Sequence, residues 1–147
     1  MEIDVIIPLY KPGKELFTLL DKLDSQSVPV HEVILLNTGE KYFEQLIYGT
    51  RFLEKYQNIK VYHVSKKEFD HGGTRRMGVK KSSADIFVMM TQDAMPADQF
   101  LIERLLYGFS YENVAAVYAR QLPAADCQFI ERYTREFNYP KTSRLKS

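Results

Sequence analysis

A single acidic residue stands where a short apolar run ends, in the segment MMTQDAMPAD, residues 89–98. Gln92, Asp93 and Ala94 follow the run directly, so only one carboxylate occupies this position. One carboxylate suffices for Mg²⁺, which keeps several waters and takes phosphate oxygens as further ligands. Asp93 is therefore a candidate ligand for Mg²⁺ or Mn²⁺ facing a diphosphate, and the alternative is a turn residue. For Asp98 we expect only that it caps the next helix.

A second stretch, residues 66–81, gathers positive charge around two glycines. Its sequence, KKEFDHGGTRRMGVKK, holds six basic and two acidic residues, whereas the whole chain has a net charge of +1. Gly72 and Gly73 allow close backbone approach at a helix start, where free N–H groups and the helix dipole attract anions. We expect Arg75 to bind a diphosphate there, and His71 is the functional candidate among the histidines. A solvated basic helix face is the alternative. The P-loop and GxGxxG patterns are absent.

Length and composition bound the class of protein. With 147 residues, 45% apolar and 27% charged, the chain predicts one domain or part of a larger one. With a net charge close to zero, the chain has no overall positive electrostatic field that would attract nucleic acid. One cysteine, Cys127, cannot form an internal disulfide and fits a reducing compartment. The start lacks the features of a signal peptide, and no apolar run approaches the ~20 residues that cross a bilayer. We therefore expect a soluble, cytoplasmic protein that works in solution or at a membrane surface.

Strand and helix patterns alternate along the chain. Short apolar runs predict strands at residues 3–9, 31–37, 59–64, 85–91 and 113–119. Apolar residues at helical spacing predict helices at 12–26, 40–56, 97–109 and 125–139, and a loop that becomes a helix at 69–83. Asp70 is a possible N-cap of the last of these, and Gly49 weakens the helix at 40–56. The alternation predicts an α/β fold with a mostly parallel sheet flanked by helices.

Polar residues follow four of the predicted strands. In a parallel sheet the carboxyl ends of the strands share one edge, and ligands of open α/β sheets bind there. Tyr10 at that edge has a ring that can stack on a base. The alternative is that any α/β loop is polar in the same way. The residues predicted to meet at this edge are Tyr10, Asn37, Asp70, His71, Gln92 and Asp93.

Several segments resemble family 2 glycosyltransferases. DVIIPLYKPGKELFTLLDKLDSQS resembles the opening of that family, whose first strand ends in a Pro-x-Tyr-like segment, and EVILLNTG resembles its second strand. FDHGGTRRMGVKKSSADIFVMMTQDAMPAD is similar to the rhamnosyltransferase branch, where an HGGTRN-type segment precedes a strand ending in Thr-Gln-Asp-Ala. AVYARQLPAADCQFIERYTREFNYP resembles the same branch. The resemblance covers almost the whole chain and implies a GT-A fold, a Rossmann-like sandwich that binds a nucleotide-sugar donor over residues 1–147.

The resemblance also implies roles for particular positions. Asn37 stands near the base where relatives often have Asp, and Arg76 stands where they often have Asn. Gln92 and Asp93 occupy the usual two-carboxylate motif, which leaves Asp93 as the metal contact. Gln121 would border the donor sugar or the acceptor. The donor-binding residues implied in this way are Pro8, Tyr10, Asn37, Gly39, His71, Gly73, Arg75, Gln92, Asp93 and Gln121.

The implied activity is an inverting transfer of a sugar, with rhamnose from dTDP-rhamnose as the expected donor and a polysaccharide or lipid-linked sugar as acceptor. Such a reaction needs a carboxylate base, which relatives carry in a later part of the chain. We expect that base beyond residue 147, so that this chain is an N-terminal portion. The alternatives are a donor-binding module without catalysis and another nucleotide-binding α/β protein, such as a nucleotidyltransferase.

Overall fold

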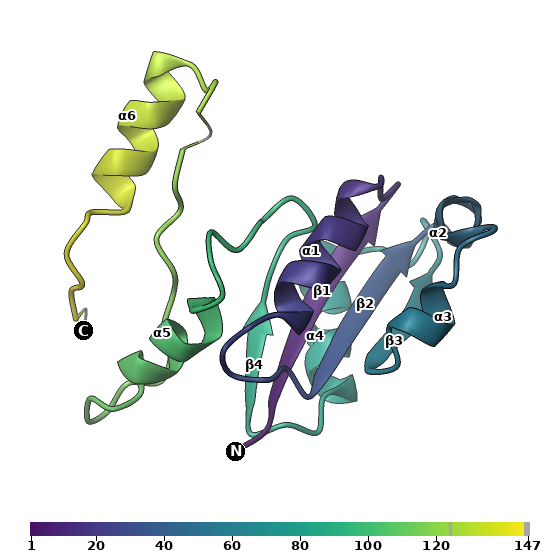
Figure 1. The fold of residues 1–147 in the computed structure, drawn as a ribbon, viewed down its shortest axis with the longest axis horizontal. Helices are drawn as coiled ribbons and strands as arrows, with labels where there is room; N and C mark the ends of the chain where they lie inside the picture. The colour runs from purple at the N-terminus through teal and green to yellow at the C-terminus, as the bar shows by residue number, and fades with distance from the viewer. Residues whose placement is uncertain (124, 146–147) are drawn as a thin grey trace. The chain divides into compact units, whose positions relative to one another are not determined.

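The computed structural model describes residues 1–123 and 125–145, which belong to two compact units, 1–102 and 103–147. The first unit is built on a four-stranded parallel sheet in the order β3–β2–β1–β4 (Figure 1). Tyr10 pairs with Thr38, and Thr38 with Val64, so these strands end level with one another. The strands are β1 (Ile3–Tyr10), β2 (Glu32–Thr38), β3 (Ile59–Val64) and β4 (Ile86–Met89).

Helices cover both faces of this sheet. In Figure 1, α1 (Glu15–Asp24) and α3 (Phe52–Lys55) lie on one face and α4 (His71–Lys81) lies on the other. Helix α2 (Glu40–Ile47) follows β2, and α5 (Leu101–Gly108) begins at the end of the first unit and continues into the second. Helix α1 buries one apolar face against the sheet, formed by Leu16, Leu19, Leu20 and Leu23. The predicted parallel sandwich is therefore confirmed for the first four strands.

Two predicted elements differ from the structure. The helix predicted at 40–56 is divided into α2 and α3, because Gly49 between them has a φ of 70° that a helix does not allow. The strand predicted at 113–119 is wrong, since this segment pairs with no strand in the part of the chain that is described. Strand propensity reflects how side chains pack on a sheet, so a segment with high propensity but no partner strand does not form a strand.

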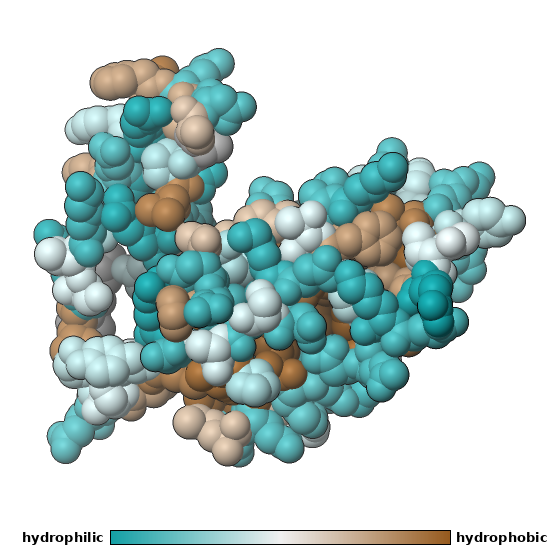
Figure 2. All heavy atoms as spheres, viewed as in Figure 1, coloured by the Kyte–Doolittle hydropathy of each residue, from teal (hydrophilic) through white to brown (hydrophobic). Residues whose placement is uncertain are grey.

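The second unit contains α6 (Phe129–Asn138), which lies within the helix predicted at 125–139. Hydrophobic side chains appear among hydrophilic ones on the surface around α6 (Figure 2). Phe129, Tyr133 and Phe137 stack along one side of it, with ring centroids 6.5 and 6.4 Å apart. Across residues 1–123 and 125–145, every helix is too short or too polar to cross a lipid bilayer.

A glycine lets α4 approach the sheet closely. Gly78 is buried, and a Cβ at this position would lie 2.6 Å from Ile6 Cγ2 and 2.7 Å from Leu36 Cδ1. Both neighbours are fully buried residues of the central strands β1 and β2. Because they are enclosed in the core, they have no space to move away from an added methyl group.

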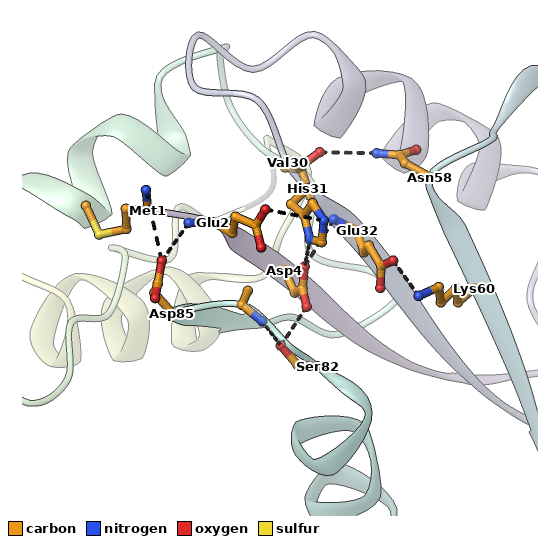
Figure 3. A network of polar contacts seen from close by, with 11 residues as sticks. Met1, Glu2, Asp4, Val30, His31, Glu32, Asn58, Lys60, Ser82 and Asp85 are labelled. Atoms are coloured by element: carbon orange, nitrogen blue, oxygen red, sulfur yellow. Dashed lines mark hydrogen bonds and ion pairs between the residues drawn. The ribbon is translucent and has the colours of Figure 1, made fainter.

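The Asp4 carboxylate lies fully buried at the amino end of β1, at the edge of the sheet opposite the carboxyl ends of the strands (Figure 3). It accepts hydrogen bonds from Ser82 Oγ at 2.6 Å and from the Glu32 backbone N–H at 3.1 Å, and it lies 2.9 Å from His31 Nδ1. It thereby joins β1 to β2 and to the link between α4 and β4. Burial raises the pKa of Asp4, but the bonds from Ser82 and His31 outweigh it, so this pKa lies below 3.8. The bond to Asp4 raises the pKa of His31 above 6.5.

Substitution of Gly78 by Ala is expected to destabilise the protein by about 1–3 kcal/mol, the usual cost of overpacking a core. Urea unfolding followed by circular dichroism measures this. Gly72→Ala is the matched control in the same helix, because its Cβ would meet nothing nearer than 3.7 Å. That variant should be neutral or up to about 1 kcal/mol more stable, since Ala favours a helix over Gly. Equal stability of the two variants would contradict the close packing.

Substitution of Asp4 by Asn is expected to cost roughly 1–3 kcal/mol of unfolding free energy, because a buried charged acceptor is lost. Asp4 stabilises the fold above its unfolded pKa and loses this effect as the pH falls through its lowered folded pKa. The contribution of protonated His31 is complete below its unfolded pKa and is lost as the pH rises through its raised one. The difference from the unsubstituted protein should therefore be largest between about pH 4 and 6.5.

Urea unfolding at about pH 3, 5.5 and 8.5 tests this dependence. Asp24→Asn, on the exposed end of α1, is the control and should change stability by less than about 0.5 kcal/mol at each pH. A constant difference between Asp4→Asn and the unsubstituted protein across this range would argue against the charged network.

Candidate functional site

Gln92 joins the ends of β1 and β4. The Tyr10 backbone N–H donates to Gln92 Oε1 at 2.8 Å, and Gln92 Nε2 donates to the Tyr10 carbonyl at 3.1 Å. The side chain thus continues the pairing of the two strands beyond Met90, whose N–H donates to the Ile6 carbonyl. Two residues that are 82 positions apart in the sequence therefore meet at the carboxyl edge, as the sequence predicts.

Lysines surround the Tyr10 ring, which is 43% exposed at this edge. The ammonium groups of Lys11 and Lys66 each lie 5.4 Å from its centroid, and the Tyr42 ring stands edge-on at 6.2 Å. The hydrogen bond from Lys66 lowers the pKa of the Tyr10 phenol below 10.0. Sequence reasoning missed both lysines as site residues. The signal for them was their place after predicted strands, with Lys11 directly after the first and Lys66 two residues after the third.

Buried polar atoms without partners lie at the same edge. The structure encloses four side-chain oxygens that have no hydrogen-bond partner among the described residues, and three of them belong to Asn37, Thr38 and Thr74. Asn37 and Thr38 end β2, and Thr74 lies in the first turns of α4. Gly39 follows directly, with a φ of 83°, and its N–H donates to the Val64 carbonyl. Because buried polar groups are rarely left unpaired, this edge is suited to bind a polar ligand.

Helix α4 begins at this edge. Asp70 caps it, because its carboxylate accepts from the Gly73 N–H, and this confirms the predicted N-cap. His71 is exposed and its ring lies 5.0 Å from that of Phe69. Arg75 is half-buried and donates from Nη1 to the His71 carbonyl at 3.1 Å. The guanidinium is therefore held beside the first turn, where the helix dipole already favours an anion.

Asp93 lies in a turn after β4, closed by a hydrogen bond from the Ala94 N–H to the Thr91 carbonyl. Its carboxylate is exposed and has no hydrogen-bond partner among residues 1–123 and 125–145. A free carboxylate is the type of ligand that a hard cation such as Mg²⁺ or Mn²⁺ prefers. Asp98 instead accepts from the Phe100 N–H at 2.9 Å, in the segment before α5, and its role as a helix cap stays a prediction.

A second group with metal-ligating side chains lies at the opposite edge of the sheet. Ligand atoms of Asp4, His31 and Glu32 lie within 4.8 Å of one another. Asp4 already accepts three protein hydrogen bonds there, and Glu32 pairs with Lys60 (Figure 3). These groups are neutralised by protein partners, so Asp93 remains the better candidate for a cation.

Two further predicted residues complete the placement. Pro8 is half-buried in β1, two residues before Tyr10. Gln121 lies in the second unit, where it is exposed and its Oε1 accepts from Arg135 Nη1 at 2.9 Å. The first unit thus brings together the ends of three strands and the start of one helix, and the role of Gln121 stays a prediction.

Comparison with known proteins agrees with these observations. The family model described as Glycosyl transferase family 2 matches residues 4–147. The chain is 35% identical to the O-antigen chain rhamnosyltransferase RfbN of Salmonella typhimurium, with 100% of this chain and 46% of that protein covered. It is 31% identical to the O-antigen chain rhamnosyltransferase WbaN of Salmonella anatum, with 97% and 44% covered. The chain therefore spans less than half the length of these curated relatives.

Solved structures show the same fold. S. aureus TarS 1-349 matches 84% of this chain and 40% of its own with a TM-score of 0.60 and 18% identity. The same protein in complex with UDP-GlcNAc matches 75% of this chain and 31% of its own with a TM-score of 0.55 and 21% identity. CMP:2-keto-3-deoxy-manno-octonic acid synthetase complexed with CTP matches 75% and 48%, with a TM-score of 0.53 and 14% identity. The predicted GT-A fold is confirmed, and the chain belongs to glycosyl transferase family 2.

Proposed function

We propose that this chain forms the donor-binding part of an inverting glycosyltransferase that moves rhamnose from dTDP-rhamnose to a polysaccharide or lipid-linked sugar acceptor. The observation that carries the proposal is the group of unpartnered buried oxygens beside Tyr10 and Gln92 at the carboxyl edge of the sheet. The names of the two relatives, both O-antigen chain rhamnosyltransferases, support rhamnose as the sugar. The likeness to TarS in complex with UDP-GlcNAc supports a nucleotide-sugar donor.

In this proposal the base and ribose lie against Pro8 and Tyr10, with Asn37 and Gly39 near the base. The diphosphate lies towards the start of α4, near His71, Gly73 and Arg75, where the positive end of the helix dipole favours an anion. Lys11 and Lys66 add two positive charges beside Tyr10. These groups hold the donor and offset the charge that develops on the departing diphosphate.

Asp93 would hold the divalent cation, and Gln92 would fix the turn from which Asp93 projects. When bound, Mg²⁺ or Mn²⁺ would supply further stabilisation of negative charge on the leaving group. We assign no general base among residues 1–147. Gln121 would border the donor sugar or the acceptor.

The site of action in this proposal is the cytoplasm or the inner face of its membrane, with peripheral attachment. A single cysteine in a chain of this length fits a reducing compartment. A lipid-linked acceptor would be met at the membrane surface, and no nucleic-acid partner is proposed because the net charge is close to zero.

A nucleotidyltransferase is the weaker alternative. The likeness to the CTP-bound synthetase, at 14% identity, concerns the fold, whereas the family model and both relatives point to glycosyl transfer. Incubation of the chain with dTDP-rhamnose and a lipid-linked acceptor distinguishes an active glycosyltransferase from a donor-binding module without catalysis. Glycosylated product supports the enzyme, and donor binding without product, together with product from a longer form, indicates a donor-binding module.

Substitution of Asp93 by Ala is expected to weaken Mg²⁺- or Mn²⁺-dependent binding of dTDP by at least roughly tenfold, the loss seen when even outer partners of a metal are removed. Binding measured without the cation should stay unchanged, because no protein contact is lost. Isothermal titration calorimetry with the cation and with EDTA gives both values. Asp24→Ala, at the exposed end of α1, is the control. If affinity with the cation is the same in Asp93→Ala as in the unsubstituted chain, Asp93 is a turn residue.

A further inference from the structure

The side-chain amide of Asn37 has one satisfied end and one unsatisfied end. Asn37 is the last residue but one of β2, and its side chain is fully enclosed. Its Nδ2 lies 3.0 Å from His63 Nδ1, while its Oδ1 is buried without a partner among the described residues. A buried carbonyl oxygen without a donor is unfavourable. This arrangement indicates that an N–H donor from outside the protein completes it.

His63 determines which end of the amide is free. In the observed amide orientation Nδ2 donates, which requires that His63 Nδ1 accepts and that the proton of a neutral imidazole is on Nε2. Nε2 faces Glu40 Oε1 at 3.9 Å, and the Phe43 ring packs against the imidazole with centroids 5.9 Å apart. Helix α2 thus holds the imidazole from one side, and β2 pairs Asn37 with His63 in register on the other.

The role of His63 depends on the amide of Asn37, which stands where the family resemblance implies Asp. A carboxylate, the group that relatives often carry at this position, accepts hydrogen bonds through both oxygens in either orientation. An amide accepts through one atom only and donates through the other, so its orientation decides what it recognises. In this chain the orientation is set by a partner on the neighbouring strand.

We propose that His63 is a positioning residue for base recognition, which holds the Asn37 amide so that Oδ1 accepts a hydrogen bond from the donor's base. The inference rests on the proposed function and deepens it. Thymine and uracil carry a ring N–H at position 3, whereas cytosine carries an acceptor there, so this orientation selects thymidine or uridine diphosphates over cytidine diphosphates. Oδ1 is enclosed in the ligand-free structure, so the proposal requires that the groups covering it shift when the base binds.

Calorimetry with dTDP, UDP and CDP, each with Mg²⁺, tests the selection. The unsubstituted chain should bind dTDP and UDP roughly tenfold more tightly than CDP, as expected for one well-placed hydrogen bond. In His63→Leu the amide is free to turn, and this ratio should fall towards one. His63→Gln keeps an acceptor opposite Nδ2 and should retain most of the preference. Equal binding of the bases by the unsubstituted chain, or an unchanged ratio in His63→Leu, overturns the proposal.

A second measurement needs no variant. Two-bond ¹H–¹⁵N NMR spectra of the ligand-free chain above the pKa of the imidazole report the tautomer of each histidine. We expect the proton of His63 on Nε2, and a proton on Nδ1 overturns the assignment. If dTDP and CDP bind equally well, the donor site stands and the selection by Asn37 fails. If no nucleoside diphosphate binds, both the proposed function and the selection by Asn37 fail.

Discussion

Parallel pairing of β1 with both β2 and β4 is the constraint on which the candidate site depends. Each strand of a parallel sheet needs a crossover before the next, so residues far apart in the sequence reach one edge together. The register places Tyr10 opposite Thr38, and Gln92 closes the other side of β1 through two bonds to the Tyr10 backbone. A shift by one residue in either pair would turn alternate side chains to the other face and separate these groups.

The two edges of the sheet carry polar groups in different states. At the amino edge, the buried Asp4 carboxylate is saturated by Ser82, His31 and a backbone N–H, so that it stabilises the fold and has little capacity left for a ligand. One oxygen of Glu32 is the unpartnered atom there. At the carboxyl edge, the unpartnered oxygens belong to Asn37, Thr38 and Thr74, beside an exposed aromatic ring and cationic side chains. Polar groups that fold the protein find partners within it, and those that recognise a ligand keep capacity free.

The sequence predicts the parts of this structure that depend on local pattern. Continuous apolar runs predict β1 to β4, and leucines at helical spacing predict α1 with its buried face. The prediction of a strand at 113–119 was wrong because a strand forms only against a partner strand, and the composition of a segment does not reveal whether it has one. The carboxylate of Asp4, inside an apolar run, and the pairing of Asn37 with His63 escaped prediction for the same reason. Their partners come from distant segments, and a single sequence does not show which segments become neighbours.

Gln92, at a position where the family resemblance implies a carboxylate, contributes hydrogen bonds to this edge but no negative charge. Both polar atoms of Gln92 bind the Tyr10 backbone, so this position serves as a link between strands. The carboxylate of Asp70 is occupied in capping α4, whereas the Asp93 carboxylate after β4 is free of hydrogen-bond partners among the described residues. Lys11 and Lys66 beside Tyr10, and Arg75 in the first turns of α4, carry three positive charges. Under the proposed function, an edge with this balance would attract a diphosphate through protein cations and a helix start, and a bound cation would add to that attraction.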